Sequence, residues 1–161
     1  MVSRMNSQKN PQRNQTAAQA EIEPDVAAEI RARLDFTHWP VLLMRMPGQG
    51  RGRASMLLGM MQEALQRDEP FVVVADMEEY ARQPQESDED RRAAAQWLKR
   101  HHARFFRLCR GNVYVLADPQ ARAAVLDSGR RQARASGMAV QAAATQHEAL
   151  ALARELLQKA D

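Results

Sequence analysis

Phe71-Val72-Val73-Val74-Ala75-Asp76 is the stretch that decides the fold. Its five apolar residues run without interruption, after Pro70 and before an acidic, polar segment. A valine-rich run that is apolar on both faces is typical of a strand covered on both sides. We therefore predict that residues 71–76 form the central strand of an α/β sheet with helices packed over it.

Further strands are predicted on either side of the central strand. Residues 41–46 precede it, and residues 112–117 and the alanine-rich residues 139–144 follow it. Residues 29–35 alternate charged and apolar side chains, which favours a half-buried strand. A helix from Asp25 is the alternative, because Ala-Ala-Glu also favours helix. We prefer the strand, which would open the sheet with a hairpin.

Helical periodicity fills the intervals between these strands. Residues 54–67 carry an apolar stripe, and residues 87–110 repeat apolar side chains at helical spacing up to Gly111, which we expect to end that helix as a left-handed cap. Two more helices begin at Asp118-Pro119 and at the capping box Thr145-Gln146-His147-Glu148. Residues 78–86 are expected to be a loop. The order predicts an α/β fold with four to five mostly parallel strands, an initial hairpin, and about four covering helices.

The composition favours one domain in a reducing compartment. The chain has 161 residues, 45% of them hydrophobic, and a single cysteine, so a disulfide framework within the chain is excluded. No apolar run approaches the roughly 20 residues of a membrane span. We expect a cytoplasmic protein with a disordered, basic and polar tail at residues 1–20 and a single domain at residues 21–161.

The placement of charge is more informative than its total. The net charge of +3 equals the charge of the three bases in residues 1–20, so the rest of the chain is neutral and gives no reason to expect nucleic-acid binding. Residues 76–90 hold seven acids and one base, whereas residues 91–110 hold seven bases and no acid. Acids at a helix start and bases toward its end are the commoner explanation. The alternative is a basic helix face for an acidic partner.

The segment from Gly48 to Arg53 is the one candidate for binding an anion. Gly48, Gly50, Arg51, Gly52 and Arg53 lie where a strand passes into a helix, as in phosphate-binding loops. The third glycine of a dinucleotide motif is not in place, and no Gly-Lys-Ser/Thr follows. We favour a flexible turn, keep a small-anion or nucleotide site as the alternative function, and predict no cofactor.

No catalytic or metal-binding set is assembled by the spacing. His101 and His102 are adjacent on the predicted helix and point about 100° apart, so they cannot chelate one metal ion. Cys109 falls on the apolar face, where an inert buried thiol is the default. We therefore predict that the chain is not an enzyme.

The strand order and several local patterns resemble the STAS fold, specifically the SpoIIAA-like, anti-sigma-factor-antagonist-like proteins of bacteria. The resemblance covers roughly residues 30–157 and rests on Trp39-Pro40-Val41, the central strand, Arg91-Arg92 before Trp97, the segment from Cys109 to Val115, and Thr145 to Leu150. It implies a regulatory or protein-interaction module, with a protein partner in bacterial signalling, rather than an enzyme.

Ser87 is the one residue at which the regulatory switch of that family could be sought. Phosphorylatable members carry Asp-Ser-Ser/Thr-Gly after the central strand, but here Met77-Glu78-Glu79 follow Asp76, and the next serine is Ser87. Four acids within three residues of Ser87 would repel a phosphate there. We therefore prefer Ser87 as a helix cap over Ser87 as a switch.

Overall fold

The protein is described from a computed structural model that covers residues 24–48, 52–82, 87–134 and 136–159. The predicted tail at residues 1–20 lies outside this part of the chain. The helices are α1 (Pro24–Ala32), α2 (Arg53–Leu65), α3 (Glu78–Arg82), α4 (Asp88–Leu108), α5 (Pro119–Ala133) and α6 (Gln146–Lys159). The strands are β1 (Leu34–Asp35), β2 (Val41–Arg45), β3 (Phe71–Asp76), β4 (Cys109–Val115) and β5 (Ala139–Ala143).

The five strands form one sheet in the order β1-β2-β3-β4-β5. β1 is antiparallel to β2, and the other neighbouring pairs are parallel. The predicted fold class is therefore confirmed: an α/β fold with a mostly parallel sheet and an initial hairpin. The sequence predicted about four covering helices, and the described part of the chain also contains α1 and α3.

Side chains of β3 alternate between two apolar clusters, one on each face of the sheet. Phe71, Val73 and Ala75 belong to the first cluster, and Val72 and Val74 belong to the second. Successive side chains of a strand point to opposite faces, and all five are buried here. The prediction that this stretch forms a strand covered on both sides is confirmed.

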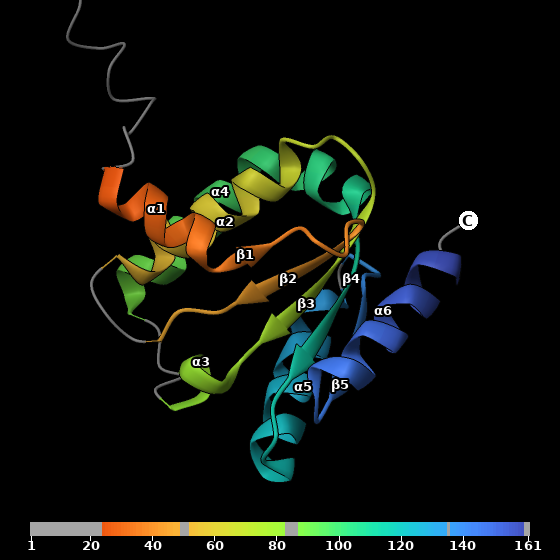
Figure 1. Cartoon of the computed structure of the whole chain (residues 1–161). Helices are drawn as coiled ribbons and strands as arrows, with labels where there is room; N and C mark the ends of the chain where they lie inside the picture. Colours follow the sequence, from red (N-terminus) through yellow and green to blue (C-terminus); the bar gives the residue numbers. More distant parts are fainter. Residues whose placement is uncertain (1–23, 49–51, 83–86, 135, 160–161) are drawn as a thin grey trace, which may run out of the picture.

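The helices that connect the parallel strands lie on one face of the sheet (Figure 1). α2, α4 and α5 contribute Met60, Phe105 and Val125 to the cluster that contains Phe71. Right-handed crossovers between sequential neighbours all fall on the same side, which explains the shared face. Among the described helices, only α6 covers the opposite face, through Ala149 and Ala153.

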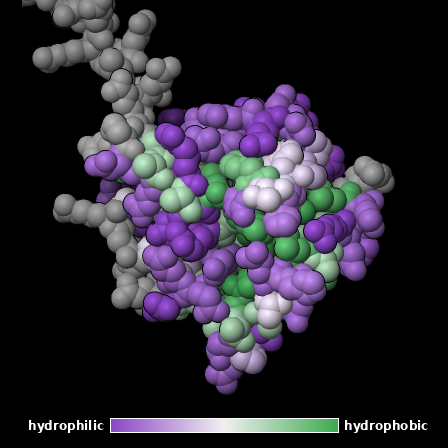
Figure 2. All heavy atoms as spheres, viewed as in Figure 1, coloured by the Kyte–Doolittle hydropathy of each residue, from purple (hydrophilic) through white to green (hydrophobic). Residues whose placement is uncertain are grey.

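The face covered by α6 is incompletely closed. Leu43 and Val115 pack against the second cluster yet stay half-buried. Figure 2 shows hydrophobic side chains that reach the surface between hydrophilic ones in the middle of the molecule. None of the described helices is long and apolar enough to cross a membrane.

The prediction of a strand at residues 29–35 is wrong for most of that range. The alternative helix forms as α1, and β1 keeps only Leu34 and Asp35, opposite Met44 and Leu43. Val26 and Ile30 lie one helical turn apart and both pack into the first cluster. This tertiary contact overrides the alternating pattern that favoured the strand.

Two further boundaries differ from the expectation. Residues 78–82 form α3 rather than a loop, and residues 83–86 lie outside the described part. Gly111 is not a helix cap, because α4 ends at Leu108 and Gly111 lies within β4. A Cβ at Gly111 would stand 2.9 Å from Cδ1 of Leu156 and 3.0 Å from the Ala139 carbonyl oxygen. A side chain at residue 111 would therefore crowd both α6 and the backbone of β5, which favours glycine here.

Candidate functional site

An apolar pocket opens near the carboxyl ends of the parallel strands, between α2, α3 and α5. Its cavity volume is about 430 Å³, within the range of about 300–1,000 Å³ for small-molecule sites. Met46 follows β2, Met77 follows β3, and Tyr114 lies near the end of β4, so three neighbouring strands contribute to the lining. Open α/β sheets bind their ligands in crevices at this end of the strands.

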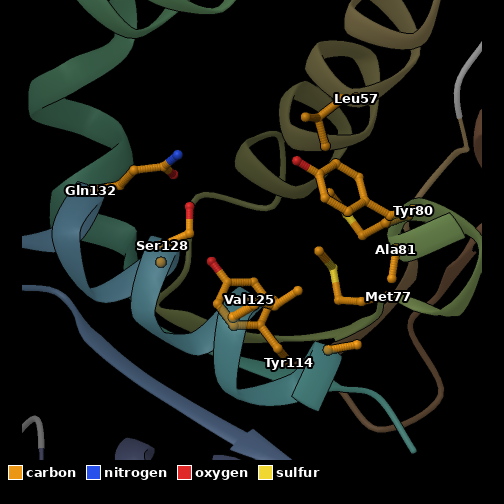
Figure 3. Close-up of a pocket in the computed structure, with 12 residues that line it drawn as sticks. Leu57, Met77, Tyr80, Ala81, Tyr114, Val125, Ser128 and Gln132 are labelled. Atoms are coloured by element: carbon orange, nitrogen blue, oxygen red, sulfur yellow. The ribbon is translucent and has the colours of Figure 1, made fainter. Parts of the chain in front are cut away.

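The polar atoms of the pocket gather on its α5 side. Ser128 and Gln132 are four residues apart on α5 and so share one face of the helix. Figure 3 shows their side chains beside the hydroxyl of Tyr114, with hydrophobic side chains across the cavity. Tyr80 enters from α3 on the far side, with its hydroxyl directed toward α2. The pocket thus has three hydrogen-bonding side chains along the α5 wall, and across from them mostly hydrocarbon with the single hydroxyl of Tyr80.

The Tyr114 ring fits beneath α5 because its neighbours are small. Its register partners on β3 and β5 are Ala75 and Ala142. Above it, the buried Gly129 of α5 leaves room that a side chain would fill: a Cβ there would stand 2.5 Å from Cε2 of Tyr114. Two alanines and one glycine therefore make space for the ring and for the cavity next to it.

The electrostatics of the pocket favour neutral groups. Burial raises the pKa of the Tyr114 phenol above its ordinary value, and repulsion from the charges that Tyr80 and Cys109 would carry adds to the effect. None of the side chains that line the pocket is charged. Ser128 has no histidine or carboxylate beside it among these lining residues, so no base is in place to activate it.

The structure turns one end of the segment from Gly48 to Arg53 inward. Gly50 and Arg51 lie outside the described residues. Gly52 has φ +82° and precedes α2, and Arg53 is only 5% exposed. The Arg53 guanidinium lies 4.0 Å from the centroid of the Tyr80 ring. Both described ends of the segment therefore contact α3: Arg53 packs against Tyr80, and Gly48 lies against Glu79.

Ser87 occupies the capping position of α4. Its Oγ accepts a hydrogen bond of 3.0 Å from the Asp90 backbone N–H. The first turn of α4 follows Ser87 and is acidic, with Asp88, Glu89 and Asp90. Carboxylates are favourable there because they face the positive end of the helix dipole. The geometry at Ser87 is that of a cap surrounded by like-charged neighbours.

The histidines and the cysteine are separated by the fold. His101 is half-buried against Trp97, with ring centroids 4.7 Å apart, and His102 is exposed against Phe106. Cys109 begins β4 and is 2% exposed, and burial raises the pKa of its thiol to about 12. Among the described residues, no three histidine, cysteine, aspartate or glutamate side chains are grouped to hold a metal ion.

The outward surface of α4 is a second candidate site, for a macromolecule. Four exposed bases lie on one side of α4: Arg92, Lys99, Arg100 and Arg107. Helix positions seven or eight residues apart lie close in angle and adjacent positions point about 100° apart, so the four bases span an arc of about 100°. We refer to these four residues as the basic row. Arg107 is paired with Asp68 at 3.7 Å, whereas Arg92, Lys99 and Arg100 have no acidic partner among the described residues.

A cavity of about 370 Å³ lies on the other face of the sheet, near the start of α6. Its lining includes both bases and acids, among them Arg33, Arg45, Asp76 and Glu78. Arg33 already pairs with Glu79 at 3.1 Å and with Glu29 at 3.4 Å. Charges of both signs are present, so the lining gives no preference for an anion or a cation.

No protein-family model, curated protein or solved structure matches this chain. The resemblance to STAS-like domains accordingly rests on the sequence patterns and on the observed order of strands and helices.

The sequence interpretation missed the pocket because its residues come from segments far apart in the chain. Tyr80 was assigned to a loop, and Tyr114 was one residue of a buried strand. Two local signals were present: Ser128 and Gln132, which share one face of α5, and Gly129 inside a helix, where glycine is unfavourable. A glycine inside a helix indicates a close approach of another segment, here the Tyr114 ring.

Proposed function

We propose that this chain is a non-enzymatic, regulatory protein-interaction module of STAS-like type, and that the basic row of α4 binds an acidic protein partner. The observation that carries the proposal is the exposed set of Arg92, Lys99 and Arg100, which have no acidic partner among the described residues. The order of strands and helices supports the STAS-like part, because it is the layout that the sequence resemblance implies.

The stability of α4 does not account for the basic row. The helix dipole acts within the first and last turns, and only Arg107 of the row lies in the last turn. Arg92 lies in the second turn of α4, beyond the reach of the dipole. Arg100 and Arg104 are four residues apart, a like-charge spacing that costs roughly 0.2–0.5 kcal/mol in a helix. The dipole therefore accounts for Arg107 alone, and Arg100 adds a like-charge repulsion, so binding is the better explanation of the row.

The distribution of acids favours a protein over a nucleic acid as the partner. Asp88, Glu89 and Asp90 form the first turn of the same helix. A long polyanion that followed α4 would meet these carboxylates, whereas a compact acidic patch could contact the basic row alone. Complementary charges of this kind chiefly raise the association rate and select the partner.

Charge reversal provides the test. One variant reverses three charges of the basic row: Arg92→Glu, Lys99→Glu and Arg100→Glu. The matched control reverses three charges elsewhere on the surface: Arg130→Glu, Arg134→Glu and Arg154→Glu. The control residues are exposed on α5, at its C-cap and on α6, and have no acidic partner among the described residues. We expect tagged wild-type protein and the control variant to co-purify the same acidic protein from the native host, and the α4 variant to lose it.

The interaction should also weaken as salt rises, since exposed charges are screened within about 10 Å at 0.1 M salt. A partner retained by the α4 variant, or one lost equally by the control variant, would refute the basic row as the binding surface. Co-purification of nucleic acid alone would refute the protein partner.

A further inference from the structure

We propose that the pocket between α2, α3 and α5 binds a neutral aromatic compound of one or two rings that carries a hydroxyl or carbonyl group. The inference goes beyond the proposed protein interaction, because no residue of α4 lines this pocket. Its failure would leave the proposed role of the basic row untouched.

The charge of the ligand follows from the lining. None of the lining side chains carries a charge, and an ion transferred into such a site would lose its hydration without gaining a counter-charge. Arg53 approaches Tyr80 but is not part of the lining. A neutral molecule meets no such penalty.

The size and the apolar wall favour rings. An engineered cavity of about 150 Å³ holds benzene, so a cavity of about 430 Å³ has room for a two-ring compound. Met46 and Met77 supply thioether sulfurs, and Tyr80 and Tyr114 supply ring surfaces. Sulfur and aromatic side chains both make favourable contacts with an aromatic guest.

The polar end of the ligand follows from three polar side chains on the α5 side of the pocket. The side chains of Tyr114, Ser128 and Gln132 make no hydrogen bond to another residue in the described part of the chain, although all three lie along one wall. Hydroxyl and amide groups can donate and accept. A hydroxyl or carbonyl oxygen on the guest would pair with them, while its rings occupy the hydrocarbon side.

Three probes with the same ring system separate these requirements. Naphthol is neutral and carries a hydroxyl, naphthalene lacks the polar group, and naphthoate replaces it with a charge at neutral pH. Binding is followed by calorimetry and by methyl NMR of Met46 and Met77. We expect naphthol to bind saturably and to shift both methyl signals, and each of the other two compounds to bind at least fivefold more weakly.

Matched variants locate the site. Ala124 lines the pocket, and Ala123, its neighbour on α5, does not, although both are exposed. Ala124→Phe should reduce naphthol binding at least tenfold, and Ala123→Phe should leave it unchanged. Ser128→Ala should weaken naphthol binding severalfold without affecting naphthalene. The last variant tests the site even if Ala124→Phe impairs folding, because it only removes an unpaired hydroxyl.

Three results would overturn the proposal. The first is the absence of saturable binding by naphthol at millimolar concentration. The second is binding of naphthoate as tight as that of naphthol, which would point to an anion site. The third is naphthol binding that survives both Ala124→Phe and Ser128→Ala, which would place the compound elsewhere on the protein.

Discussion

The ring of Tyr114 lies directly against the backbone of Gly129, where a Cβ would stand 2.5 Å from Cε2 of the ring and 2.9 Å from its hydroxyl oxygen. Strand β4 and helix α5 reach this separation only because residue 129 has no side chain. The contact fixes the position of the Tyr114 hydroxyl, and with it the polar wall of the pocket.

Gly129→Ala should therefore destabilise the protein, although alanine is the better helix former. Overpacking typically costs about 1–3 kcal/mol, against a gain in helix propensity of about 1 kcal/mol. In a Tyr114→Leu background the clash with the ring is gone, and the same substitution should stabilise. A double-mutant cycle in urea measures the coupling. Equal effects of Gly129→Ala in both backgrounds would contradict the contact.

Tyr114 should ionise at higher pH than a free tyrosine. Burial raises its pKa above 10.0 in the folded protein, so the phenol stabilises the fold below the unfolded pKa, and this contribution is lost as pH rises through the folded pKa. The chain has two tyrosines, so Tyr80→Phe isolates the signal of Tyr114. Its tyrosinate absorbance should appear only above the range of a denatured sample, and coincident titrations would contradict the burial.

Cys109 should be inert in the native protein. Its thiol pKa is raised from 9.0 to about 12 by burial, which lowers the thiolate fraction at neutral pH by about a thousandfold. An aromatic disulfide reagent should react stoichiometrically in denaturant and negligibly within the same time without it. Rapid, complete reaction of the folded protein would show that the first residue of β4 is accessible.

Ser87→Ala should lower the free energy of unfolding by about 1 kcal/mol, because it removes the cap acceptor for the Asp90 N–H. Ser87→Asp should be nearly neutral, since aspartate also caps. Urea unfolding of the three proteins measures both effects. If Ser87→Asp instead broke a partner complex that Ser87→Asn preserved, negative charge at this position would be regulatory.

The Arg33–Glu79 pair should make stability depend on pH. Hydrogen bonding to Arg33 lowers the pKa of Glu79 below its ordinary 4.5, so the pair stabilises the fold above that pH, and its contribution is lost as pH falls through the folded pKa. Glu79 is nearly half exposed, which limits the effect to about 1 kcal/mol or less. Glu79→Gln should cost stability at neutral pH but not in acid, whereas Glu155→Gln should do so at neither.

Local sequence determined the regular elements that carry strong patterns of their own. The run from Phe71 to Ala75 is valine-rich and apolar at every position, and as a strand covered on both faces it is buried throughout. The caps at Ser87 and Asp118 work through bonds to residues three positions ahead, so they too could be read from the chain. Such features depend on neighbours in sequence, and the parallel sheet followed from their order.

Tertiary structure alone decided what depends on approach between distant segments. It selected helix over strand at Ile30, because the buried side chain packs beneath α2. It placed Gly111 within β4, close to Leu156 of α6, rather than at a helix end. No local sequence pattern indicates that Leu156 lies nearby. The pocket belongs to the same class: Tyr80, Tyr114 and Ser128 are far apart in the chain, and a cavity is the volume that their packing leaves unfilled.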